Sequence, residues 1–161
     1  ETIALSSLLF LLAAFVGLTA SALPEIVASH FGATGAANGF MPRGIYMTVM
    51  LLLILGVPLL LAFIPTSIAG PSGTKLNIPH REYWLAPERR EATLAYIGGM
   101  ARWFAGLVAV FLAYVHWLVV RAHRLQPPEL STAGITAGLV IFFLLSSAWL
   151  ATLWAHFRRH G

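Results

Sequence analysis

Cysteine and aspartate are missing from this chain, and charge of either sign is scarce. Without cysteine there can be no disulfide, no thiolate metal site and no cysteine nucleophile. Only 10% of the 161 residues are charged, whereas 58% are hydrophobic. A chain this apolar cannot cover a globule with polar surface, so its composition indicates an integral membrane protein. The formal net charge of +4 is scattered at the ends of apolar runs, which argues against a nucleic-acid partner.

Four apolar runs approach the roughly 20 residues that are needed to cross a ~30 Å hydrocarbon core. Each must be a helix, because an open strand would leave its backbone groups unpaired in lipid. We therefore expect an all-α fold, an antiparallel four-helix bundle that forms a single membrane domain over residues 1–161. The first run lacks the basic start of a secretory signal, so we expect a retained helix. The expected helices cover about residues 3–22, 45–64, 87–121 and 133–157, with an outer loop at 23–44 and a cytoplasmic loop at 65–86.

The distribution of Lys and Arg predicts the orientation, because cytoplasmic loops carry the excess. Lys75, Arg81, Arg89, Arg90, Arg158 and Arg159 fall on one side, and Arg102 lies near it. Arg43, Arg121 and Arg124 fall on the other side. Both termini are therefore predicted to be cytoplasmic, and the 23–44 loop lies outside.

The second half of the cytoplasmic loop reads NIPHREYWLAPERRE. Pro87 is a good first helical residue, so we expect the third helix to begin there and to run without a break through Val120. Tyr83, Trp84 and Leu85 would then lie at the membrane boundary. Arg81, Arg89 and Arg90 would face anionic lipid or a partner.

Small residues four apart predict close helix packing. Such sets occur in the first run at Ala13, Gly17 and Ser21, and in the third at Ala101, Ala105, Ala109 and Ala113. In the fourth run, Gly134 and Gly138 form a GxxxG pair, which is typical of an interface with another protein. Packing inside the protein's own bundle is the alternative.

The outer stretch ALPEIVASHFGATGAANGF is longer than a helical hairpin needs. Its apolar residues can anchor it to helix ends, and its glycines permit tight turns. We therefore expect an ordered cap, in which His30 makes a hydrogen bond to the backbone.

Within this stretch, Leu23-Pro24, His30-Phe31, Gly35, Gly39-Phe40 and Pro42-Arg43 follow a first membrane helix. The pattern resembles a bacterial integral-membrane family of unknown function, whose module also forms the front part of immunity proteins of the sporulation-delay toxin system. Gly32 and Phe40 depart from it, since the family commonly has asparagine and tryptophan there. The resemblance implies a bacterial cytoplasmic (inner) membrane, multi-pass location. The candidate residues of the cap, for interaction or structure, are Pro24, Glu25, His30, Phe31, Gly35, Gly39, Phe40 and Arg43.

Metal or haem binding is the chemistry that these residues leave open. Glu25, His30, His116 and His123 are the candidate ligands on the outer side, since imidazole and carboxylate suit zinc, iron or copper. His116 and His123 are seven residues apart, about 10 Å along one helix, so both cannot ligate a single ion. A site from Glu25, His30 and one helical histidine stays open, as does haem bound through His116. The alternative is that His30 fixes the loop and His116 lies in an aromatic belt.

Enzyme signatures are missing: we find no phosphate loop, no paired carboxylates and no serine with a nearby base. We therefore expect no catalytic residue and no cofactor. The leading hypothesis is a non-enzymatic membrane protein that acts as an interaction or accessory subunit of a membrane assembly, with lipids and a membrane protein as partners. The alternatives are an immunity or sensing protein against a membrane-active toxin peptide, and a metal- or haem-binding membrane protein.

Overall fold

The computed structural model describes residues 2–69 and 76–158. Four of its helices are long and apolar enough to cross a membrane, as expected of a multi-pass membrane protein. Lys75 and Arg159, which entered the charge count, lie outside the described residues. The elements are α1 (Thr2–Ala20), β1 (Ile26–Phe31), β2 (Ala37–Pro42), α2 (Arg43–Ala69), α3 (Arg81–Trp84), α4 (Arg90–Ala122) and α5 (Thr132–Arg158).

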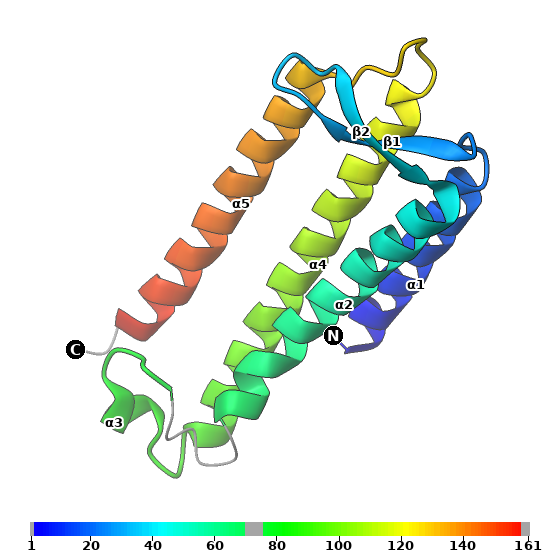
Figure 1. Cartoon of the computed structure of the whole chain (residues 1–161). Helices are drawn as coiled ribbons and strands as arrows, with labels where there is room; N and C mark the ends of the chain where they lie inside the picture. The colour runs from blue at the N-terminus through cyan, green and yellow to red at the C-terminus, as the bar shows by residue number, and fades with distance from the viewer. Residues whose placement is uncertain (1, 70–75, 159–161) are drawn as a thin grey trace.

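Helix α4 occupies the centre of the molecule (Figure 1). It packs against α1 and α2 on one side and against α5 on the other. The chain ends lie at one end of the helices and the two strands at the opposite end (Figure 1). Within α5 the buried residues are Gly138 and Phe157. Helices α1, α2 and α4 therefore make the tighter part of the packing, and α5 is added to α4.

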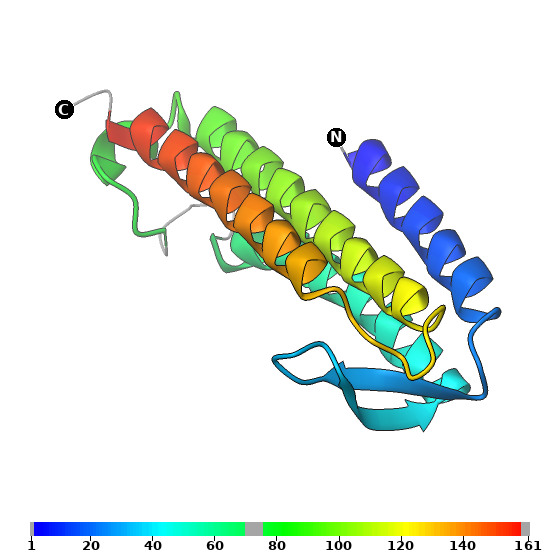
Figure 2. The same cartoon turned by 90° about the horizontal axis from the view of Figure 1, so that it is seen from above.

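Side-chain size explains this asymmetry. The predicted alanine stripe of α4 is buried, and Ala105 and Ala109 are fully so, which lets α1 and α2 approach closely. Toward α5, α4 presents rings instead: Phe104 stacks on Trp149 and Phe111 on Phe142, with centroids 4.7 and 4.6 Å apart. Stacked rings hold two helices further apart than alanines do. In the view from above, α1 and α5 lie on opposite sides of α4 (Figure 2).

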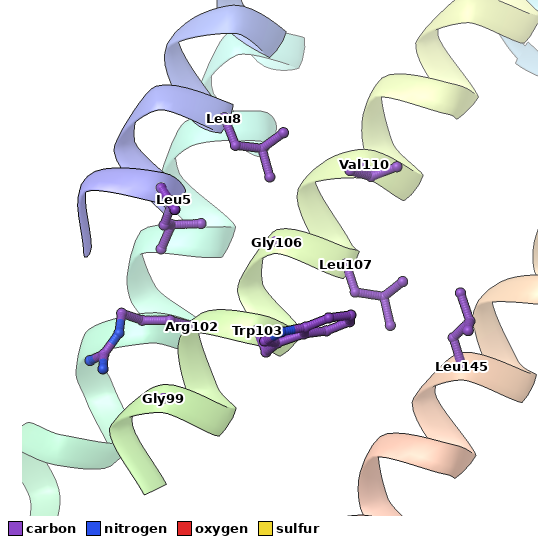
Figure 3. A pocket seen from close by; sticks show the side chains of 10 residues that line it. Leu5, Leu8, Gly99, Arg102, Trp103, Gly106, Leu107, Val110 and Leu145 are labelled. Atoms are coloured by element: carbon purple, nitrogen blue, oxygen red, sulfur yellow. The ribbon is translucent and has the colours of Figure 1, made fainter. Parts of the chain in front are cut away.

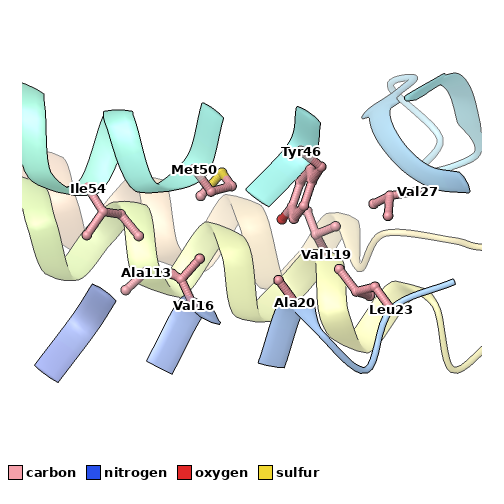
Figure 4. Packing of buried hydrophobic residues seen from close by; sticks show 9 residues of the cluster. All are labelled: Val16, Ala20, Leu23, Val27, Tyr46, Met50, Ile54, Ala113 and Val119. Atoms are coloured by element: carbon pink, nitrogen blue, oxygen red, sulfur yellow. The ribbon is translucent and has the colours of Figure 1, made fainter. Parts of the chain in front are cut away.

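The main apolar core lies beneath the strands, where α1, α2, α4 and β1 meet (Figure 4). Val16, Val27 and Ile54 are completely buried there. This cluster ties the outer stretch to the helices. Its members are Val16, Ala20, Leu23, Val27, Tyr46, Met50, Ile54, Ala113 and Val119.

The outer stretch contains a β-hairpin, so the fold is mostly helical but not all-α. Val27 pairs with Met41 and Ala28 with Phe40 in an antiparallel register. Gly35 has φ +89°, a conformation that glycine adopts readily, and it lets the chain reverse between the strands. A two-stranded sheet is marginal by itself, so its stability depends on the contacts with the helices described below.

The third long helix begins at Arg90, three residues later than the proline-based prediction. Arg89 N–H bonds the carbonyl of Ala86, and so does Arg90 N–H, which closes the first helical turn. Pro87 thus lies in the tight turn that leads into the helix. From Arg90 the helix continues through Arg102 to Ala122 without a break. The short helix α3 precedes it.

Candidate functional site: the outer cap

We call the hairpin 26–42 together with the α4–α5 connection 123–131 the outer cap. His123, at the end of α4, attaches the hairpin to this helix. Its Nδ1 donates to the Val119 carbonyl at 2.8 Å, which leaves Nε2 to accept the Ala28 N–H at 3.0 Å. One imidazole thus fixes β1 to α4.

Arg43 attaches the other end of the hairpin. Its guanidinium donates to the carbonyls of Ser21 and Leu23, at 3.0 and 2.8 Å. These carbonyls follow the end of α1, where partial negative charge attracts a cation. The Arg43 backbone N–H also bonds the carbonyl of Glu25 at 2.8 Å. Arg43 therefore joins the start of α2 to the chain that leaves α1.

The tip of the hairpin rests on the α4–α5 connection. Leu130 N–H donates to the Gly35 carbonyl at 2.8 Å, and Ala36 forms a β-bridge with Glu129. A side chain at Gly35 would collide with the Leu130 carbonyl. Glycine is thus required here both by its positive φ and by the close approach of a second segment.

Beneath the cap, His116 is completely buried and connects three helices. The Thr19 hydroxyl donates to the Phe15 carbonyl at 2.6 Å, so its oxygen accepts from His116 Nε2 at 2.8 Å. The Tyr46 hydroxyl lies 2.8 Å from Nδ1 and is then the donor. This set fits a neutral ring with its proton on Nε2. Since both ring nitrogens are used within the chain, the arrangement leaves neither for a haem iron.

The four candidate metal ligands do not come together. Among residues 2–69 and 76–158, no group of three His or Glu side chains could hold an ion. His116 is buried in the core, His123 binds Ala28, and His30 is exposed with its Nδ1 3.1 Å from the Ser29 hydroxyl. The predicted bond from His30 to the backbone is therefore wrong, because His123 supplies that anchor. The His30 side chain packs on Gly39 instead. A Cβ added at Gly39 would lie only 2.9 Å from the Cβ of His30.

Part of the hairpin surface is apolar, beside the exposed polar residues His30 and Asn38. Ile26 is 58% exposed and Phe40 57%, and Pro42 beside them is also exposed. Pro24 and Glu25 are exposed as well, whereas Phe31 is half-buried against the core. A firmly attached strand pair thus presents apolar side chains away from the helices.

The predicted contact residues at the opposite end of the molecule serve mainly local structure. Trp84 is buried, and its indole donates to the Phe157 carbonyl at 3.2 Å. Arg89 lies over the Tyr83 ring at 4.0 Å and donates to its carbonyl. Arg90 Nε donates to the Leu85 carbonyl at 3.4 Å. Arg81 and Tyr83 are exposed, as a contact with lipid or a partner requires.

The GxxxG pair faces α4 within the chain. A Cβ at Gly138 would overlap the Tyr114 ring, and one at Gly134 would lie 3.0 Å from Leu118. The Tyr114 hydroxyl donates to the Gly134 carbonyl at 2.9 Å. Of the two readings of this pair, the structure favours packing inside the protein.

Sequence reasoning missed three polar partners, the half-buried Thr19 and the buried Tyr46 and Thr93. Thr93 donates to the Trp84 carbonyl at 2.8 Å and holds α3 on α4. The only signal in the sequence was a polar residue within or beside an apolar run. Such a signal does not identify the partner.

Residues 8–61 match a family model described as a domain of unknown function, DUF1648. The match covers most of α1, the hairpin and most of α2, and it ends before α4. It supports an uncharacterised, membrane-type family for this part of the chain. No curated protein matches the chain. No solved structure matches it either.

Proposed function

We propose that this protein is a non-enzymatic interaction protein, an accessory subunit of a membrane assembly, and that its partner binds the outer cap. One observation carries the proposal: Ile26 and Phe40 are more than half exposed on strands that are fixed to the helix ends. Exposed apolar side chains on a fixed scaffold form a contact surface without an ordering cost at the moment of binding. Aromatic residues are also the most common anchors of interfaces.

The polar groups around the cap support a scaffold more than a catalyst. His123, Arg43 and His116 each bond groups of the chain itself. Side chains used in this way position backbone segments and are not directed at a substrate. The function is therefore proposed to reside in the shape and apolar character of the cap.

We further propose that the four helices run antiparallel in a bacterial inner membrane, with both termini cytoplasmic and the cap outside. Arg81, Arg89 and Arg90 lie at or near α3, at the end that carries the termini (Figure 1). The positive-inside tendency places that end in the cytoplasm. A reporter that is active only outside the cytoplasm, fused after Gly161, should stay silent. Activity would reverse the orientation.

An immunity or sensing role against a membrane-active toxin peptide is the second candidate. It is favoured because most of the residues that carry the family resemblance lie in the cap, where an arriving peptide would first meet the protein. Both candidates use the same surface, but the partner differs: a resident membrane subunit in the first and an external peptide in the second.

Site-directed photo-crosslinking in the native membrane tests the proposal. A photoreactive residue in place of Phe40 should give one discrete protein adduct, and Ile26→Ser in the same chain should weaken it. The control is the same residue in place of Phe143, which is 62% exposed on α5 and would face lipid. An adduct with a resident subunit supports the accessory role, and one with an added toxin peptide supports immunity. If Phe40 and Phe143 give the same products, the cap is not the contact surface.

A further inference from the structure

A groove of about 510 Å³ opens between α1, α4 and α5 (Figure 3). Small-molecule sites in proteins commonly have volumes of roughly 300–1,000 Å³. Gly106 lies on its floor, and Trp103, 74% exposed, lies beside it. Apolar side chains from all three helices form the walls, among them Leu5, Leu8, Leu107 and Leu145.

Arg102 is the one charged side chain among the described residues that line this groove. It lies near one end of the groove, one helical turn from Gly99, and close to the start of α1, since Leu5 lines the same groove. The two helices stay side by side, since Thr19 and His116, each fourteen positions further on, are hydrogen-bonded. The apolar run of α4 from Trp103 to Val120 begins directly after Arg102 and spans about 27 Å at the helical rise, so this level is where α4 enters the membrane. Arg102 is therefore at headgroup depth.

The length of the groove corresponds to one lipid leaflet. Gly99 and Val110, at its two ends, are eleven positions apart on α4, about 16.5 Å at the helical rise. One leaflet contributes about 15 Å to the hydrocarbon core. A neighbouring groove of about 250 Å³ shares Leu107, Val110 and Leu145 and extends the apolar path toward Tyr114. The groove thus combines a cation, Arg102, near one end with an apolar path about as long as one leaflet. These two features suit an amphiphile that has one anionic end.

We propose that this groove binds an anionic phospholipid from the leaflet on the side of the chain termini. The phosphate is held by the Arg102 guanidinium, whose five donors allow it to bind an anion beside another contact. One acyl chain lies along Gly106 between Leu8 and Leu107. The inference is independent of the partner proposed for the cap, because it concerns lipid alone.

Quenching of tryptophan by brominated lipid tests this directly. The purified protein is reconstituted in phosphatidylcholine vesicles with a small fraction of acyl-brominated phosphatidylglycerol, or the same fraction of brominated phosphatidylcholine. The difference from Trp103→Phe isolates the signal of Trp103. We expect the anionic lipid to quench Trp103 about fivefold more effectively, as one basic residue near a charged headgroup gives.

Variants then assign the preference. Arg102→Gln should bring the two lipids to equal quenching, and Arg102→Lys should retain most of the preference. Gly106→Leu should abolish it by filling the groove. In contrast, Gly106→Ala should preserve it, because that Cβ would make an ordinary 3.5 Å contact with Leu8. The charge control is Arg81→Gln, which removes an exposed cation outside the groove.

Three results would overturn the proposal. Equal quenching of the unmodified protein would mean that only bulk lipid is present. A loss in Arg81→Gln as large as in Arg102→Gln would indicate general surface charge. Protection of Trp103 from both lipids would indicate that a second copy or another helix covers the groove.

Discussion

The hydrogen bond between Tyr46 and His116 should be measurable as a coupling between α2 and α4. His116→Phe leaves the buried Tyr46 hydroxyl without its acceptor, and Tyr46→Phe leaves Nδ1 without its donor. A buried polar group without a partner costs about 1–3 kcal/mol, so each single variant should be destabilised by that amount. The double variant removes both groups. Its loss should therefore be smaller than the sum of the single losses.

We expect a coupling free energy of about 1 kcal/mol. Hydrogen bonds between membrane helices average about 0.6 kcal/mol and reach about 1.7. The Tyr46–His116 bond belongs near the upper part of this range, because His116 is fully buried and its Nε2 bonds Thr19 as well. The four proteins form a double-mutant cycle. Packing changes caused by each single substitution also occur in the double variant, so they largely cancel in the coupling free energy.

The measurement is reversible unfolding in mixed micelles, with the free energy of unfolding taken for the parent, both single variants and the double variant. Tyr114→Phe is the matched control, since it also removes a hydroxyl from a tyrosine but one that bonds the Gly134 carbonyl. It should be additive with His116→Phe. Additivity of Tyr46→Phe with His116→Phe, within about 0.3–0.5 kcal/mol, would refute the buried network.

Two further comparisons test the cap. His123→Ala should speed hydrogen exchange of the Ala28 amide, which donates to this ring. His30 is exposed, so His30→Ala should change the free energy of unfolding by less than about 0.5 kcal/mol. If His30→Ala had the larger effect on the hairpin, His30 would be the anchor. Gly35→Ala should destabilise the protein by more than about 1 kcal/mol, because of its positive φ and its collision with the Leu130 carbonyl. Gly32→Ala should be tolerated in the same thermal assay, because its Cβ would lie 3.6 Å from the nearest atom, Asn38 Nδ2. Equal losses of stability in the two variants would contradict the account of Gly35.

The long helices, and the face on which α4 packs most tightly, follow from patterns in the sequence. Runs of about 20 apolar residues have one solution in lipid, because only a helix satisfies its own backbone. The alanines of α4 repeat every four residues, and this local periodicity is enough to place them on one face. The order of the outer stretch was also foreseeable, since it contains enough apolar residues to be anchored.

Which polar groups meet depends on how the helices and the hairpin are arranged in space. His30 and His123 are equivalent candidates in the sequence, yet the ring that reaches the hairpin backbone comes from a residue 95 positions away. Similarly, Gly138 faces Tyr114 and not another protein because α5 lies on that side of α4. Periodicity tells which residues share a face, but not which element that face will meet. Hydrogen bonds act over about 3 Å, so they are fixed only when the helices and the hairpin are in place.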